Sequence, residues 1–173
     1  MYSLLKNKSI FLLFIMGVFL FVNISSLAKK NQPLADFEES KFNTNFRNYN
    51  QKIKFTNNLN HNIAEFMIAI ADTPEKQQYG LMNLDFLPQN LGMIFIKEQT
   101  QNISMWMKNT LIPLDMIFLD ENFIVNHIAE NTTPHSLAVI SSPYNSRAVL
   151  EVNAGIAKKF NIKIGDKLII NKL

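Results

Sequence analysis

The sequence predicts a mainly β domain, either a β-sandwich or a partly open barrel of seven or eight short strands, with two short α-helices. Two observations predict this class. Apolar or alternating runs of four to nine residues recur from residue 52 onward, and polar or turn-forming residues separate most of them, a spacing typical of all-β domains. Only two stretches combine a helix-start residue with a following helical pattern. The length of 173 residues is enough for one domain and too small for two of ordinary size.

The strands are expected where side chains alternate between two faces or where a short apolar run is bounded by turns. Residues 63–71 show the alternation most clearly, with Glu65, Met67 and Ala69 on one face and Phe66 and Ile68 on the other. The runs that predict strands are residues 52–56, 63–71, 91–96, 103–108, 114–119, 123–128, 146–152 and 167–170.

Two short helices are expected between these strands. Asp72 or Thr73 is a good N-cap with Pro74 in the first turn, which predicts a helix to about Met82. Asn153 is a candidate cap for a second helix ending near residue 160. Residues 132–144 hold two prolines and three serines, which predicts a long surface loop.

The N-terminal segment is typical of targeting rather than of the fold. Residues 1–28 contain two lysines, an unbroken apolar run from Ile10 to Val22 and the ending Ser26-Leu27-Ala28, as in a cleaved signal peptide. An uncleaved N-terminal anchor is the alternative. The chain is therefore expected to be exported to the periplasm or envelope. Residues 29–51 predict a polar, Asn-rich spacer, and residues 52–173 a single β-rich domain.

Composition removes several function classes. The net charge of +3 is too small and too evenly spread to predict nucleic-acid binding. The absence of cysteine excludes disulfides, cysteine nucleophiles and thiolate metal sites. The three histidines are not spaced as metal ligands on one element, so we expect no metal site and no cofactor.

A hairpin of residues 103–108 and 113–119 is expected to carry the most informative side chains. If Lys108 pairs with Pro113, one face of the hairpin is apolar and includes Met105, Met107 and Met116. The opposite face then presents an indole, an ammonium and a carboxylate close together, because parity fixes which residues share a face. These three groups come from Trp106, Lys108 and Asp115.

Other polar residues extend this candidate site. Asn109 and Thr110 lie in the predicted turn and can form hydrogen bonds. In residues 146–152, Ala148, Leu150 and Val152 are expected to face inward, which leaves two charged residues on the other face. The candidate ligand-binding residues are therefore Trp106, Lys108, Asn109, Thr110, Asp115, Arg147 and Glu151, and no catalytic residue can be assigned.

The chain also resembles a known family, that of domain of unknown function 192. The segment Met105-Trp-Met-Lys-Asn-Thr-Leu-Ile-Pro-Leu-Asp-Met-Ile-Phe118 carries the family's central motif, and further blocks at residues 70–75, 80–82, 91–95, 149–155 and 164–166 occur in the same order. The resemblance implies a small exported or membrane-attached β-rich domain with no established activity. The usual Asp-Gly turn is replaced here by Asp120-Glu121-Asn122, in which Asn is expected to take the left-handed conformation.

Two functions follow from these residues, and the sequence leaves both open. The first is a binding module for a small polar ligand or a partner's chain terminus, with Trp106 as a stacking surface and Lys108 and Arg147 as anion partners. The second is a purely structural network in which Lys108, Asp115 and Glu151 are buried together. A binding site would leave Trp106 and Lys108 accessible to solvent, whereas a structural network would bury them.

Enzyme and copper chemistry are less favoured alternatives. A serine hydrolase lacks a Gly-x-Ser-x-Gly nucleophile turn, and a glycosidase would have to use Asp115 and Glu151. Thioether ligation of Cu(I) needs several converging methionines. The candidates are Met82, Met93, Met105, Met107 and Met116, of which three fall on the predicted apolar face.

Overall fold

The computed structural model describes residues 47–170, so the predicted signal peptide or anchor and most of the predicted spacer lie outside the described residues. The strands and helices follow the order of the chain. They are β1 (Gln51–Thr56), β2 (Asn62–Ala71), α3 (Pro74–Tyr79), β3 (Leu91–Gln101), β4 (Ser104–Met105), β5 (Leu114–Leu119), β6 (Val125–Ala129), β7 (Ile140–Ser141), β8 (Ser146–Asn153), α4 (Ile156–Lys159) and β9 (Lys167–Ile170).

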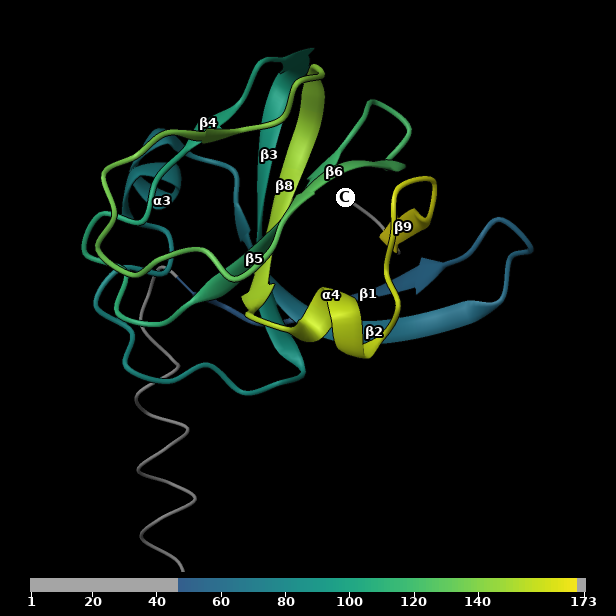
Figure 1. Cartoon of the computed structure of the whole chain (residues 1–173), viewed down its shortest axis with the longest axis horizontal. Helices are drawn as coiled ribbons and strands as arrows, with labels where there is room; N and C mark the ends of the chain where they lie inside the picture. Colours follow the sequence, from purple (N-terminus) through teal and green to yellow (C-terminus); the bar gives the residue numbers. More distant parts are fainter. Residues whose placement is uncertain (1–46, 171–173) are drawn as a thin grey trace, which may run out of the picture. The chain divides into compact units, whose positions relative to one another are not determined.

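Seven of these strands form one curved sheet, in the order β6-β5-β8-β3-β2-β1-β9, and β4 and β7 form a separate pair. Every neighbouring pair in the large sheet is antiparallel except β2 and β3, which are parallel. The connection between parallel strands carries α3, as a crossover requires. Figure 1 shows β3 and β8 in the middle of this arrangement. The predicted mainly β class with two short helices is confirmed.

The two edges of the large sheet meet at one place, which makes the fold a partly open barrel. Ile124, just before β6, forms an isolated bridge with Lys167 in β9. Backbone hydrogen bonds from Val125 to Asp166 and from Leu168 to Phe123, both 2.8 Å, reinforce the contact. Joining the edges at this point satisfies backbone groups that an open edge would leave to solvent.

The inside of the barrel is a continuous apolar core. β8 contributes Ala148, Leu150 and Val152 to it, as their alternation predicts. Phe66 packs edge-on against Phe55 and Phe160, with ring centroids 6.4 and 5.8 Å apart. Such offset aromatic contacts add to the burial of apolar area.

The outer face of β3, β5 and β8 is buried as well, which explains why β5 is buried along its whole length. The side chains on this outer face include Met116 and Phe118 from β5 and Val149 from β8. The connecting segments cover them with residues such as Leu81, Leu84, Leu87 and Met107. The candidate site is built in this outer layer.

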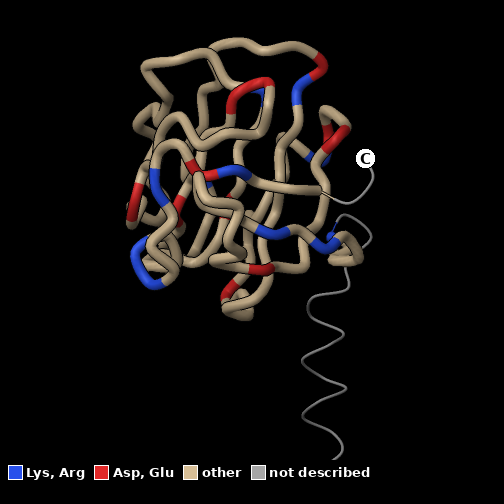
Figure 2. The backbone as a smooth tube through the Cα atoms, turned by 90° about the vertical axis from the view of Figure 1, so that its right-hand side faces the viewer, with Lys and Arg blue, Asp and Glu red and all other residues tan. Residues whose placement is uncertain are grey.

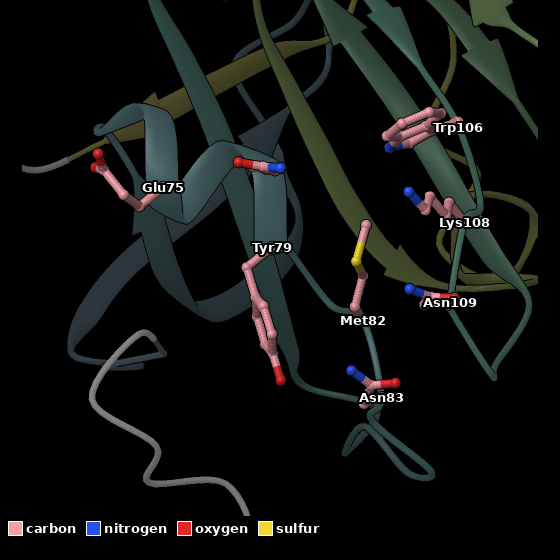
Figure 3. A pocket seen from close by; sticks show the side chains of 8 residues that line it. Glu75, Tyr79, Met82, Asn83, Trp106, Lys108 and Asn109 are labelled. Carbon is pink, nitrogen blue, oxygen red and sulfur yellow. The ribbon is translucent and has the colours of Figure 1, made fainter.

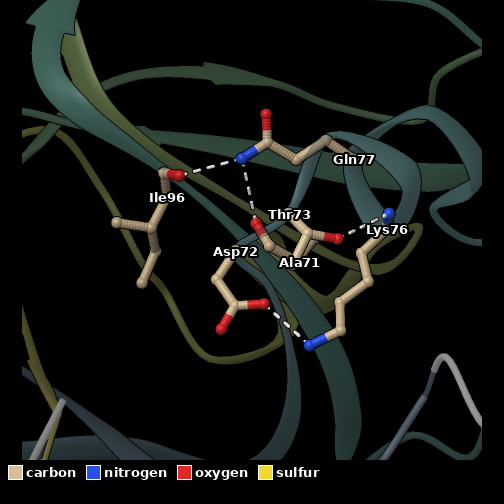
Figure 4. A network of polar contacts seen from close by, with 6 residues as sticks. All are labelled: Ala71, Asp72, Thr73, Lys76, Gln77 and Ile96. Carbon is tan, nitrogen blue, oxygen red and sulfur yellow. Dashed lines mark hydrogen bonds and ion pairs between the residues drawn. The ribbon is translucent and has the colours of Figure 1, made fainter.

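The first helix begins where the sequence predicts. The Thr73 side chain accepts a hydrogen bond of 3.3 Å from the backbone N–H of Lys76, so Thr73 is the N-cap. Figure 4 shows how α3 is fastened: Gln77 Nε2 donates to the carbonyls of Ala71 and Ile96, and Lys76 pairs with Asp72 at 2.7 Å. The helix ends at Tyr79, earlier than predicted, because Gly80 leaves the helical conformation with φ of 49°.

The predicted hairpin of residues 103–108 and 113–119 is wrong. Met105 in β4 pairs with Ile140 in β7, so the predicted loop 132–144 contains a strand. β5 instead lies between β6 and β8. Met107 and Met116 are fully buried, whereas Met105 is only half-buried. Because β5 is buried on both faces, the burial of Met116 does not test the expected parity. An apolar pattern does not determine which strand lies beside another.

Two further local predictions are corrected. Asn153 does not cap α4; its side chain donates to the carbonyls of Leu87 and Pro88 at 2.7 and 3.2 Å. Gly155 is the N-cap residue, in the left-handed conformation. In the turn after β5, the left-handed residue is Phe123 and not Asn122, because the Asp120 carboxylate accepts from the N–H groups of Asn122 and Ile124 and sets the turn.

The described surface is mixed in charge. Figure 2 shows lysine and arginine interspersed with aspartate and glutamate along the described backbone, in keeping with the small net charge. Within residues 47–170, no helix has the length and apolar character needed to cross a bilayer.

Candidate functional site

A groove of about 380 Å³ lies between α3 and the turn of residues 106–110. Figure 3 shows its two sides: Trp106, Lys108 and Asn109 lie on one side, and Glu75 and Tyr79 of α3 lie on the other, with the Glu75 carboxylate directed away from Trp106. Met82 and Asn83, from the segment after the helix, lie between the two sides. The groove therefore joins parts of the chain that are about 30 residues apart in sequence.

The 106–110 turn is held in place by its backbone. The N–H of Thr110 donates to the Met107 carbonyl, and the N–H of Met107 donates to Ser136 at 3.0 Å. Asn109 takes a positive φ of 54°, a conformation that Asn tolerates better than most residues. Its carbonyl accepts 2.8 Å from the N–H of Asn83, which links the turn to the opposite side of the groove.

Arg47, within the predicted spacer, anchors the α3 side. It is buried, and its guanidinium donates to the carbonyls of Gly80 at 3.1 Å and Met82 at 2.6 Å. The guanidinium also lies 5.2 Å from the centre of the Tyr79 ring. These contacts satisfy carbonyls at the helix C-terminus, where a cation is favourable. A residue that precedes β1 therefore helps to hold the α3 side of the groove.

Trp106 and Lys108 form the accessible wall of the groove. Trp106 is 46% exposed, and the Lys108 ammonium lies 5.1 Å from the centre of its ring. Among the described residues, no ion pair neutralises Lys108. A large aromatic surface with a cation beside it is an arrangement that recognises flat or charged groups.

A smaller cleft of about 20 Å³ adjoins the groove, since Gln78, Tyr79, Met82 and Trp106 line both. This volume is enough for one water-sized group. Glu151 lines the cleft from β8, together with Phe95, Met105 and Thr110.

Glu151 is the most perturbed acid of the described residues. It is 4% exposed and makes no hydrogen bond to another described side chain or backbone group. Loss of hydration disfavours its charged form and raises its pKa to about 8. Glu151 is therefore largely protonated at neutral pH in the unliganded protein.

Tyr49 adds a second buried polar group near this acid. Its hydroxyl is buried without a hydrogen-bond partner among the described residues. Burial is the main cause that raises the pKa of Tyr49 to about 12; the neighbouring Arg47 cation opposes the shift and the Glu151 charge adds to it. The phenol and the carboxyl are therefore within electrostatic reach of each other.

Five of the seven predicted site residues line the two connected spaces, and two lie elsewhere. Trp106, Lys108 and Asn109 line the groove, whereas Thr110 and Glu151 line the cleft together with Trp106. Arg147 is half-buried at the start of β8 and lines neither space.

Asp115 faces the other side of the molecule from the one predicted. Its carboxylate accepts from the N–H groups of Asn131 and Ala157, both at 2.9 Å. The predicted network of Lys108, Asp115 and Glu151 is thus not formed in the described structure: Lys108 is exposed, and the two acids are buried in separate surroundings.

The methionines do not converge into a described metal site. Met93, Met107 and Met116 are fully buried, and only Met82 and Met105 line the cleft. Within residues 47–170, no group of three or more His, Asp or Glu side chains could hold a metal ion.

The α3 side of the site and the segment before β1 were not predicted from the sequence. Glu75, Tyr79 and Met82 belong to a short helix and its exit, where the sequence pattern predicts a helix but no ligand-binding role. Arg47 and Tyr49 lie in a polar stretch without periodicity. In that stretch, the close spacing of the Arg47 cation and the Tyr49 ring was the one feature that could have indicated a site.

Comparison with known proteins gives the family without a function. The family DUF192, "Uncharacterized ACR, COG1430", matches residues 55–170. A candidate transcription regulator from Sinorhizobium meliloti 1021 has a similar structure, with 32% identity over 71% of this chain and 95% of that chain and a TM-score of 0.68. A protein of unknown function from Novosphingobium aromaticivorans DSM 12444 is 34% identical over 68% of this chain and 83% of that chain, with a TM-score of 0.64. The comparison with curated proteins gives no match. The chain therefore belongs to the DUF192 family.

Proposed function

We propose that this domain is a binding module that holds a small polar ligand, free or as the terminus of a partner chain, in the groove between α3 and the 106–110 turn. One observation carries the proposal. The exposed Trp106 ring and the Lys108 ammonium lie together at the wall of a groove of about 380 Å³, a volume in the range of small-molecule sites.

The chemistry of the groove suggests what such a ligand would carry. Lys108 offers a cation for an anionic group, and Trp106 offers a flat face for stacking or apolar contact. Asn109 supplies an amide group at the same wall, and Asn83 supplies another from the segment after α3. Glu75, on the opposite side, prevents the groove from being uniformly positive, which favours a polar ligand of mixed charge over a polyanion.

Export is part of the same proposal. The apolar run and the small-x-small ending of residues 1–28 support transfer to the envelope. A binding module there would meet ligands outside the cytoplasm, either released after cleavage or held by an uncleaved N-terminal segment.

The test uses the full-length chain expressed in its own host and purified without denaturation. Native mass spectrometry should show a retained small-molecule adduct on the unchanged chain. The adduct should be lost in Lys108→Gln and kept in Lys158→Gln, a matched change of an exposed lysine on α4. An adduct that both variants retain, or a bare chain in every preparation, would contradict the proposal.

A further inference from the structure

The cleft beside the groove has a composition that the groove lacks. Its base holds Glu151, whose side chain is almost wholly removed from solvent and has no hydrogen bond to a described residue. Two aromatic rings, Tyr79 and Trp106, and two thioethers, Met82 and Met105, line the same space. A buried unpaired carboxyl next to a cavity is costly unless a partner enters.

The Glu151 carboxyl favours a cationic partner over an anionic one. The Tyr79 and Trp106 rings limit access of water to such a pair; each already has a cation over its ring, Arg47 and Lys108 respectively. The cavity of about 20 Å³ accommodates one group of the size of water, and a primary ammonium is of that size. An ionised Glu151 would supply the opposite charge. The guanidinium of Arg47 does not take this place, because it is bonded to the carbonyls of Gly80 and Met82.

Lys108 lines the adjoining groove, and Trp106 lines both the groove and the cleft. A ligand that extends from the cleft into the groove would therefore pass from a carboxyl to an ammonium along one indole. Opposite charges at the two ends of a site select a ligand with the reverse polarity.

We propose that the cleft is an ammonium subsite, in which Glu151 binds the primary ammonium of a small zwitterionic ligand whose carboxylate lies at Lys108. The inference rests on the binding function proposed above and names its ligand class. Because Glu151 is mostly protonated in the free protein, binding the ammonium displaces one proton from its carboxyl to solvent.

Because binding releases a proton from Glu151, the affinity for the ligand should depend on pH. Below about pH 8, affinity should rise about tenfold per pH unit, because the binding form of Glu151 becomes more populated. The other charged or titratable groups around the cleft and groove are Arg47, Tyr49, Glu75 and Lys108. Burial raises the pKa of Tyr49 to about 12, so this phenol stays protonated between pH 6 and 9.

The experiment titrates the full chain with unbranched ω-amino acids from glycine to 6-aminohexanoate, with butylamine and butanoate as single-charge controls. Fluorescence of Trp106, the single tryptophan of the chain, reports binding. Calorimetry in two buffers of different ionisation enthalpy reports proton release. We expect one chain length to bind at least about tenfold tighter than either control and to release close to one proton at pH 6.5.

The variants separate the two proposals. Glu151→Gln keeps the shape of the side chain and should lose the tenfold preference, the pH slope and the proton release. Lys158→Gln should change nothing. The ammonium subsite is refuted if butanoate binds as tightly as the amino acid, if no proton is released, or if Glu151→Gln binds unchanged. It is also refuted if no amino acid binds while the native adduct still depends on Lys108, a result that leaves the binding module intact.

Discussion

The carboxylate of Asp115, the second residue of β5, accepts a hydrogen bond of 2.9 Å from the backbone N–H of Ala157, in the first turn of α4, 42 residues later in the chain. Its second oxygen atom accepts from the N–H of Asn131. The N-cap residue of α4, Gly155, has no side chain to cap the helix. The fully buried carboxylate of Asp115 in β5 therefore caps the N-terminus of α4, which its own sequence does not cap.

The first prediction concerns this carboxylate. Asp115→Ala should lower the free energy of unfolding by about 3 kcal/mol, because it leaves the buried N–H of Ala157 and the partly buried N–H of Asn131 without their charged acceptor. Asp120→Ala should cost only about 1 kcal/mol, because the N–H groups of Asn122 and Ile124 can turn to water in a partly exposed turn. Urea unfolding of the two variants measures the difference, and equal midpoints would contradict this assignment.

The second prediction concerns Glu151 and pH. Folding raises its pKa from 4.5 to about 8, so the folded state binds the proton more tightly. The stability due to this group is fully present below pH 4.5 and is lost as the pH rises to 8, by about 1.4 kcal/mol per pH unit. The unliganded chain should therefore unfold more easily at pH 8 than at pH 5.5.

Glu151→Gln provides the control for that pH dependence. The amide cannot ionise, so the variant should exceed the original chain in stability at pH 8 and match it more closely at pH 5. Chemical unfolding at several pH values checks the slope. A pH-independent difference between the two chains would show that Glu151 does not titrate in this range.

The third prediction tests the role of Met107. It is fully buried, and the Thr132 hydroxyl lies 3.2 Å from its sulfur. Met107→Leu conserves volume and should cost less than about 1.5 kcal/mol, whereas Met107→Ala leaves a cavity and should cost about 2–5 kcal/mol. Thermal unfolding of both variants measures the ranking.

A Cu(I) titration with a competing chelator completes the third prediction. A methionine in a filled core has no route to a solvent ion, so we expect no stoichiometric uptake that depends on Met107. Tight Cu(I) binding that disappears equally in the leucine and alanine variants would mean that the sulfur is a ligand.

The fourth prediction concerns the N-terminus. Cleavage after Ala28 should give an envelope-derived protein whose sequence starts at about Lys29. N-terminal sequencing of the protein from its own host measures this directly. A chain that starts at Met1 and is extracted only by detergent would support the uncleaved anchor instead.

Local features of the fold were determined by the sequence alone, because they depend on neighbours along the chain. The inward set Ala148, Leu150 and Val152 follows from the two-residue period of a strand. The Thr73 cap follows from the preference of a hydroxyl for the free N–H groups of a first helical turn. Three members of the candidate site, Trp106, Lys108 and Asn109, were predicted from the segment 103–108 and the turn after it.

The identity of the partners was decided only by tertiary structure. Many strand pairings satisfy the same apolar pattern, so nothing local distinguished Ile140 from Met116 as the partner of Met105. The groove needs α3 and the 106–110 turn side by side. The raised pKa of Glu151 depends on the layer that covers β8, because the loss of hydration is set by packing from distant segments and not by the residue itself.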